Sequence, residues 1–124
     1  LTPQSVHALG GFKVQGRGDD AERIKAEARA LAEAGVFAIV LELVPAELAR
    51  EIARELAIPI IGIGAGNGTD AQVLVWTDLM GLTENAPRFA RAYADLRTVM
   101  RDAAMAWKAD VENSEFPSDA ESFH

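Results

Sequence analysis

The sequence lacks cysteine, which excludes disulfide bonds, thiolate-bound zinc and thiol nucleophiles within these 124 residues. Basic residues are in the minority, because 12 Lys and Arg stand against 19 Asp and Glu and give a formal net charge of −7. A protein that binds nucleic acid or an anionic membrane through a basic face is therefore disfavoured. A small anionic substrate stays compatible, because the local field of a site can oppose the net charge.

Long apolar runs and targeting signals are also missing. No run approaches the roughly 20 residues that a membrane-spanning helix needs, and no signal-peptide pattern is present. A soluble, cytoplasmic protein with one domain and a modest core is expected. The chain begins at Leu1 rather than Met, and its first residues resemble the middle of a protein, so a fragment or processed piece is predicted.

Three stretches are predicted to be β-strands. Val36–Val44 (VFAIVLELV) is rich in β-branched residues and apolar on both faces, which is typical of a parallel strand covered on both sides. Ile58–Ile63 (IPIIGI) is expected to be a second buried strand, and Gly64–Gly68 (GAGNG) its exit loop. Val73–Trp76 (VLVW) is expected to be a shorter third strand.

Two helices are predicted beside these strands. The first begins at Asp19 and Asp20, which can cap its N-terminus, and ends at Gly35, a residue typical of helix C-termini. The second opens at Pro45, which is favoured at the first helical position. Alternation of buried strands with helices predicts βαβ units, a parallel sheet and the α/β fold class.

Two further helices are expected outside this core. A short one runs from Thr2 to about Leu9. A long amphipathic one spans Pro87–Val111, where apolar and aromatic residues recur at three- and four-residue spacing and are expected to form core or a subunit interface. The polar tail after Glu112 is expected to be irregular. Three strands alone leave both sheet edges unprotected, so part of a larger fold such as a (βα)8 barrel is favoured.

Glu42 is the only charged residue in Val36–Val44 and is the strongest candidate for chemistry. Burying an isolated carboxylate costs several kcal/mol unless it is paired or protonated, so its position needs a reason. It lies near the C-terminal end of its strand, the end that faces the active site in α/β barrels and open sheets. A general base or acid is predicted. The alternative is a strand-end carboxylate that pairs with an arginine or caps the next helix.

Two loops are weaker candidates. Gly64, Gly66 and Asn67 follow the second strand, where glycines let the backbone approach a ligand closely; the alternative is a tight turn at a barrel end. The spacing matches neither the dinucleotide fingerprint nor a P-loop. Lys13 and Arg17 lie in a glycine-rich segment that is expected to be flexible, and they either close over an anionic substrate or are solvated surface cations.

No metal ligand is assigned in this chain. The two histidines are too isolated in sequence to form a metal site, and the two aspartates that flank the third predicted strand are more often turn or capping residues. The residues set aside for these reasons are His7, His124, Asp70 and Asp78.

Several long strings in the chain resemble the ketopantoate hydroxymethyltransferase family. They are LTPQSV (Leu1–Val6), GGFKVQGRG (Gly10–Gly18), LELVPAELA (Leu41–Ala49), IPIIGIGAGNGTDAQVLV (Ile58–Val75) and FPSDAESFH (Phe116–His124). The resemblance covers essentially this whole chain but only about the C-terminal half of the family's length. It implies the C-terminal part of a single (βα)8 barrel, about strands 6 to 8, with the upstream half absent.

The resemblance implies hydroxymethyl transfer from 5,10-methylenetetrahydrofolate to 3-methyl-2-oxobutanoate, giving 2-dehydropantoate in pantothenate synthesis. The family's base stands in an LExVP motif, which carries over onto Glu42 in LELVP, and it removes the C3 proton of the keto acid. The family's Mg2+ stabilises the resulting enolate, and its ligands are expected upstream of Leu1. Family members resemble decamers, so a homo-oligomer with contacts from the helix Pro87–Val111 is expected.

Two alternatives stay open. A related Mg2+-dependent lyase or mutase barrel acting on a 2-oxo acid keeps the metal-bound enolate and changes the reaction. A truncated segment that only binds or assembles has no activity. The isolated 124-residue chain is itself predicted to be inactive, because a half barrel cannot close its sheet.

Overall fold

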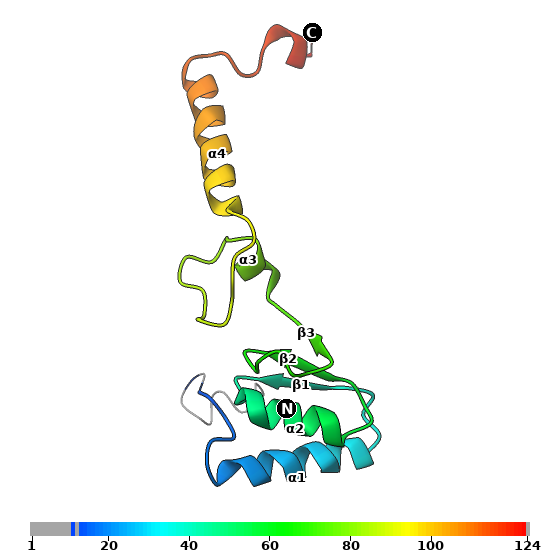
Figure 1. The fold of residues 1–124 in the computed structure, drawn as a ribbon. Helices are drawn as coiled ribbons and strands as arrows, with labels where there is room; N and C mark the ends of the chain where they lie inside the picture. Colours follow the sequence, from blue (N-terminus) through cyan, green and yellow to red (C-terminus); the bar gives the residue numbers. More distant parts are fainter. Residues whose placement is uncertain (1–10, 12, 124) are drawn as a thin grey trace. The chain divides into compact units, whose positions relative to one another are not determined.

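The computed structural model describes Gly11 and residues 13–123 (Figure 1). Contacts divide the chain into two units, Leu1–Leu74 and Val75–His124. The helix predicted from Thr2 to Leu9 lies outside the described residues, and so do His7 and His124.

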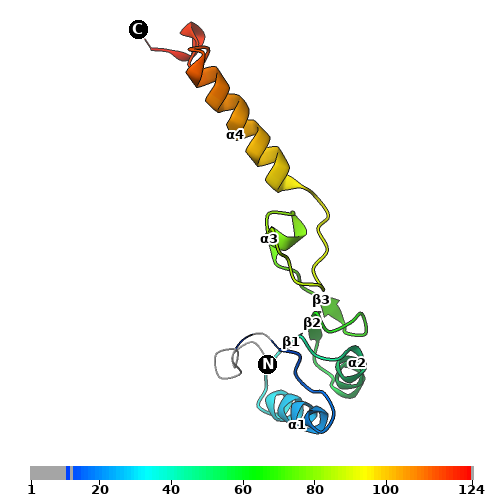
Figure 2. The same cartoon turned by 90° about the vertical axis from the view of Figure 1, so that its left-hand side faces the viewer.

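The first unit is a sheet with helices on one face. Its strands form a single sheet in the order β1 (Ile39–Glu42), β2 (Ile60–Ile63), β3 (Ala71–Gln72), and both neighbouring pairs are parallel. α1 (Asp20–Glu33) precedes β1, and α2 (Ala46–Glu55) connects β1 to β2. Figures 1 and 2 show both helices on the same side of the sheet. The predicted α/β class with a parallel sheet is confirmed.

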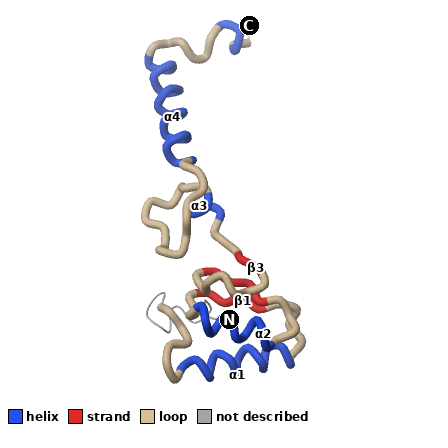
Figure 3. Tube along the Cα trace, in the orientation of Figure 1, coloured by secondary structure: helices blue, strands red, loops and turns tan. Residues whose placement is uncertain are grey.

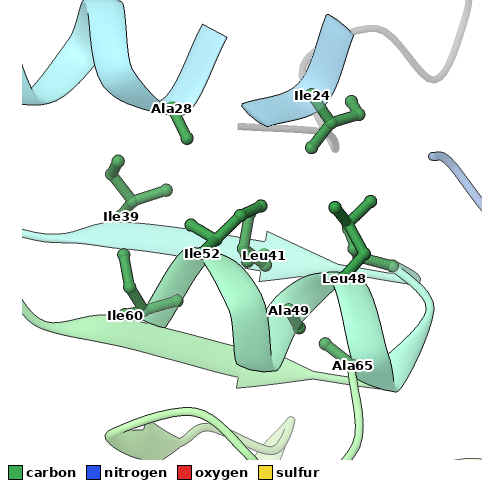
Figure 4. Close-up of a cluster of buried hydrophobic side chains, with 10 residues drawn as sticks. Ile24, Ala28, Ile39, Leu41, Leu48, Ala49, Ile52, Ile60 and Ala65 are labelled. Atoms are coloured by element: carbon green, nitrogen blue, oxygen red, sulfur yellow. The ribbon is translucent and has the colours of Figure 1, made fainter. Parts of the chain in front are cut away.

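The core of this unit lies between the two helices and the face of the sheet that they cover (Figure 4). Burying a large aliphatic side chain contributes about 1.5–3 kcal/mol relative to leaving it exposed, so this cluster is the main source of stability. On the solvent side, an ion pair between Arg29 and Glu55 ties α1 to α2. The members exposed by 1% or less are Ile24, Ala28, Leu41, Ala49, Ile52, Ile60 and Ala65.

α1 ends as predicted and begins differently. Gly35 adopts a φ of +86° and donates its N–H to the Ala32 carbonyl, an arrangement that suits glycine after a helix. At the N-terminus, the Asp19 side chain makes no capping hydrogen bond, so its predicted capping role is wrong. The Asp20 carboxylate instead accepts a hydrogen bond from the Gly16 N–H at 2.8 Å.

β1 is shorter than the predicted strand Val36–Val44. Val36 donates its N–H to the Leu31 carbonyl at the end of α1, so that amide is used there rather than in the sheet. Leu43 has a φ of +54°, which ends the extended conformation. Among the described residues helices cover one face only, and Val40 on the other face is 37% exposed. The predicted cover on both faces is therefore wrong for this part of the chain.

The second strand is confirmed as β2, which begins at Ile60 rather than Ile58, with Gly64–Gly68 as its exit loop. The third strand is wrongly placed at Val73–Trp76, because β3 is Ala71–Gln72. The Val75 carbonyl accepts hydrogen bonds from two amides of α3 (Trp76–Leu79), so the backbone there begins a helix.

The second unit contains α3, the irregular segment 80–95, α4 (Leu96–Glu112) and the short 3-10 helix η2 (Asp119–Glu121) (Figure 3). η2 begins with a capping box between Ser118 and Glu121, so the tail is not irregular throughout as predicted.

α4 begins later than the predicted Pro87. The Tyr93 N–H donates to the Leu79 carbonyl and the Leu96 N–H to the Met80 carbonyl, at 2.8 and 3.0 Å. These bonds hold the preceding backbone against the end of α3, where it cannot also be helical. The helix then starts at a polar cap, because the Asp95 side chain accepts from the Thr98 N–H.

No residue of α4 is buried. Trp107, 57% exposed, packs edge-on against Phe116 with ring centroids 6.4 Å apart. Within the described residues the predicted core role of this helix is therefore wrong, and its role in subunit contacts stays a prediction. No helix among the described residues is long and apolar enough to cross a membrane.

Candidate active site at the carboxyl edge of the sheet

Glu42 is the last residue of β1. Ile39 and Leu41 point into the core (Figure 4), and because side chains alternate along a strand, Glu42 lies on the sheet face away from the helices. It stands opposite Ile63, the last residue of β2, in the parallel register. The carboxylate is therefore at the C-terminal edge of the sheet, as predicted, and it is partly rather than fully buried.

Leu43, the residue after Glu42, has a left-handed backbone with φ +54°. That conformation costs a residue with a side chain about 1–2 kcal/mol, and strained backbone of this kind gathers at functional sites. The Leu43 N–H donates to the Ile63 carbonyl at 3.0 Å, and the Leu43 carbonyl accepts from the Gln15 N–H at 2.9 Å. No sequence signal marks this residue, since leucine is uncommon at positive φ.

The loop that carries Lys13 and Arg17 is anchored beside the end of β1. Gln15 binds the Leu43 carbonyl, and Gly16 is buried, where a Cβ would overlap the side chain of Leu48 on α2. The expected flexible loop is thus fixed at its centre. Lys13 and Arg17 on either side are exposed, so the structure brings two cations to a loop attached next to Glu42.

Asp20 strengthens this anchor from α1. Its carboxylate accepts from the Arg23 side chain and from the Gly16 N–H, and these hydrogen bonds hold the pKa of Asp20 below its usual range. A carboxylate kept ionised in this way keeps its hydrogen bond to the loop backbone. Sequence reasoning treated Asp20 only as a helix cap and missed this role.

The glycine loop after β2 is shaped by packing on α2. A Cβ at Gly66, whose φ is +74°, would overlap Ala46, and one at Gly68 would lie 2.8 Å from the Arg50 Nε. The Gln72 side chain donates to the Gly66 carbonyl at 2.9 Å and closes the turn. These contacts favour the tight-turn alternative at Gly66 and Gly68.

Gly64 and Asn67 are placed differently from those two glycines. Gly64 follows Ile63 directly and so adjoins the strand end at Glu42. Asn67 is exposed on the same loop. Of the glycine-loop candidates, Gly64 is thus the one that the structure brings to Glu42.

Among the residues that the structure describes, no group of three or more His, Cys, Asp or Glu side chains could hold a metal ion. Asp70 has a structural role, because its Oδ2 accepts the Ile60 N–H at 2.8 Å. Asp78 is buried in the second unit. These residues do not fit a Mg2+ site.

Fold and site together define a class of protein. Parallel βα units that present a carboxylate and two loops at the C-terminal edge of the sheet are typical of α/β enzymes. A family model for ketopantoate hydroxymethyltransferase matches residues 1–119. The chain belongs to the ketopantoate hydroxymethyltransferase family, and the predicted membership is confirmed.

Curated relatives agree. The 3-methyl-2-oxobutanoate hydroxymethyltransferase of Acidothermus cellulolyticus is 63% identical over 124 residues, covering 99% of this chain and 46% of that protein. The relative from Corynebacterium glutamicum, with the same name, is 58% identical over 98% of this chain and 46% of its own length. The relative from Streptomyces coelicolor, with the same name, is 57% identical over 100% of this chain and 43% of its own length. The chain spans a little under half the length of these relatives.

Proposed function

We propose that these residues form the C-terminal part of a (βα)8 barrel, about strands 6 to 8, in an enzyme that makes 2-dehydropantoate. The observation that carries the proposal is Glu42, the last residue of β1 at the carboxyl edge of a parallel sheet, within the LELVP string. Relatives named for hydroxymethyl transfer to 3-methyl-2-oxobutanoate supply the substrate class.

The proposed role of Glu42 is to accept the C3 proton of 3-methyl-2-oxobutanoate. The resulting carbanion carbon forms a bond to the methylene carbon of 5,10-methylenetetrahydrofolate, whose bonds to the folate nitrogens break. Water supplies the hydroxyl group, and its remaining proton and the proton held by Glu42 go to the two folate nitrogens, so keto acid, water and methylenetetrahydrofolate give 2-dehydropantoate and tetrahydrofolate. Glu42 lies on the sheet face away from the helices, which is the inner face once such a sheet closes into a barrel.

As the family resemblance implies, residues upstream of Leu1 would hold Mg2+; among the described residues no group of three or more His, Cys, Asp or Glu side chains could bind it. What this chain supplies is the base, the strand edge and two loops. The isolated 124 residues are therefore proposed to be inactive. The complete protein is proposed to be a cytoplasmic homo-oligomer, and the exposed apolar side chains of α4 support contacts between subunits.

The test supplies the complete protein containing these residues with 3-methyl-2-oxobutanoate and 5,10-methylenetetrahydrofolate. Mass spectrometry should detect 2-dehydropantoate, formed only when both substrates are present. Consumption of the keto acid without folate would instead support a lyase or mutase. No product from folded complete protein would refute the proposal.

Lys13 and Arg17 are proposed to bind the carboxylate of the keto acid. Replacing both by Ala is expected to raise KM for the keto acid about tenfold, equivalent to ~1.4 kcal/mol, with kcat little changed. The physical reason is that their loop is attached to Leu43, next to the base, and exposes both cations. Steady-state kinetics measures the change.

The matched control is Lys108→Ala, which removes an exposed cation paired with Glu112 on α4. It should leave KM at the wild-type value. If the double variant at Lys13 and Arg17 behaves like this control, the two residues are solvated surface cations.

A further inference from the structure

We infer that Leu43 is a positioning residue for Glu42, and that its left-handed backbone rather than its side chain sets where the base stands. The inference rests on the proposed function of Glu42. It starts from one observation, the φ of +54° at a leucine directly after the carboxylate.

The alternation of side chains shows what this conformation changes. Leu41 packs toward the helices and Glu42 lies on the opposite face. An uninterrupted strand would place Val44 on the same face as Glu42. Val44 is instead 2% exposed and belongs to the core cluster on the helix side. Leu43 therefore reverses the alternation, so Glu42 is the last side chain on the open face and Val44 returns to the core.

Contacts on both sides hold Leu43 in this state. Its N–H donates to the Ile63 carbonyl, and its carbonyl accepts from Gln15 of the anchored loop. Val44 is locked in the core on its C-terminal side. A left-handed residue other than glycine persists only where the surrounding structure holds it, so these contacts fix the backbone next to Glu42.

The neighbouring strand offers a comparison within the same sheet. Glu42 is paired with Ile63, so Leu43 and Gly64 occupy equivalent positions after β1 and β2. Gly64 is left-handed too, with φ +62°. Glycine reaches this conformation freely but leaves the chain more conformational freedom. Leucine follows the strand that carries the base, and glycine follows the strand that does not.

The experiment uses the complete protein and compares two kinds of substitution at Leu43, those that disfavour a positive φ and those that permit it. Leu43→Val and Leu43→Ile keep an apolar side chain and disfavour positive φ, whereas Leu43→Gly and Leu43→Asn remove that side chain and permit it. The readout is exchange of the C3 proton of the keto acid with solvent. For this exchange reaction, kcat of the Val and Ile variants should fall about 10- to 100-fold. Their KM for the keto acid should stay within about threefold of wild type.

The Gly and Asn variants should lose less than about fivefold in kcat, because they can still adopt the left-handed turn. Ser114→Val is the matched control, since Ser114 is also left-handed, with φ +59°, but belongs to the second unit. It should lower the melting temperature without the loss of kcat. If the Val and Ile variants do not fold, Leu43→Ala carries a smaller backbone penalty, and its kcat should fall below that of the Gly variant.

Three results are decisive. If the Gly and Asn variants are as impaired as the Val variant, the side chain matters and the inference is overturned. If Leu43→Val, or Leu43→Ala where the Val variant does not fold, has the wild-type kcat for exchange while Glu42→Gln is inactive, the inference about Leu43 is overturned and the proposed function of Glu42 stands. If Glu42→Gln retains exchange, the proposed function of Glu42 fails instead.

Discussion

Glu42→Gln should lower both C3 proton exchange and 2-dehydropantoate formation by about 100- to 10,000-fold, the range typical for loss of a general base. Gln keeps the shape of the side chain but cannot take up a proton at neutral pH. Because substrate binding is proposed to depend on other groups, KM should change much less than kcat. The measurement is exchange at C3 followed by NMR, in the complete protein without folate.

The matched control for this variant is Glu33→Gln. Glu33 is an exposed carboxylate in the last turn of α1. The change of charge is the same, and exchange should stay at the wild-type rate. Survival of exchange in Glu42→Gln, with Glu33→Gln also active, would mean that Glu42 is not the base.

Gly66→Ala should lower the free energy of unfolding by about 2–5 kcal/mol. Two costs combine, since the new Cβ overlaps Ala46, a steric penalty of about 1–3 kcal/mol, and the φ of +74° costs about 1–2 kcal/mol for a residue with a side chain. The melting temperature of the complete protein should therefore fall. Stability equal to wild type would contradict packing as the reason for this glycine.

Asn67→Ala is the companion variant on the same loop. Asn67 is exposed, so its replacement should leave the melting temperature nearly unchanged. A rise in KM for either substrate would assign a ligand contact to Asn67. An unchanged KM would leave the loop with the structural role that its contacts with α2 indicate.

Local patterns predicted α1, α2 and β2 of the first unit, but not the place of β3 or the length of β1. α1 and α2 follow from apolar periodicity and from Gly35 and Pro45 at their ends, and β2 follows from a short apolar run. The second unit was predicted less well, because its backbone hydrogen bonds join residues far apart in the sequence. Pairing of Tyr93 with Leu79 moves the start of α4, and no periodic pattern contains that information.

The sequence by itself determined the family and singled out Glu42 as the proposed base. The LELVP string identifies Glu42, and a charge within an apolar strand marks it without any comparison. Tertiary structure decided what surrounds it. Only the folded chain shows that Gln15 binds Leu43, that Leu43 is left-handed and that Gly66 packs against α2. The physical reason is that these features depend on contacts between separate segments, whereas a strand and its charged residue are local.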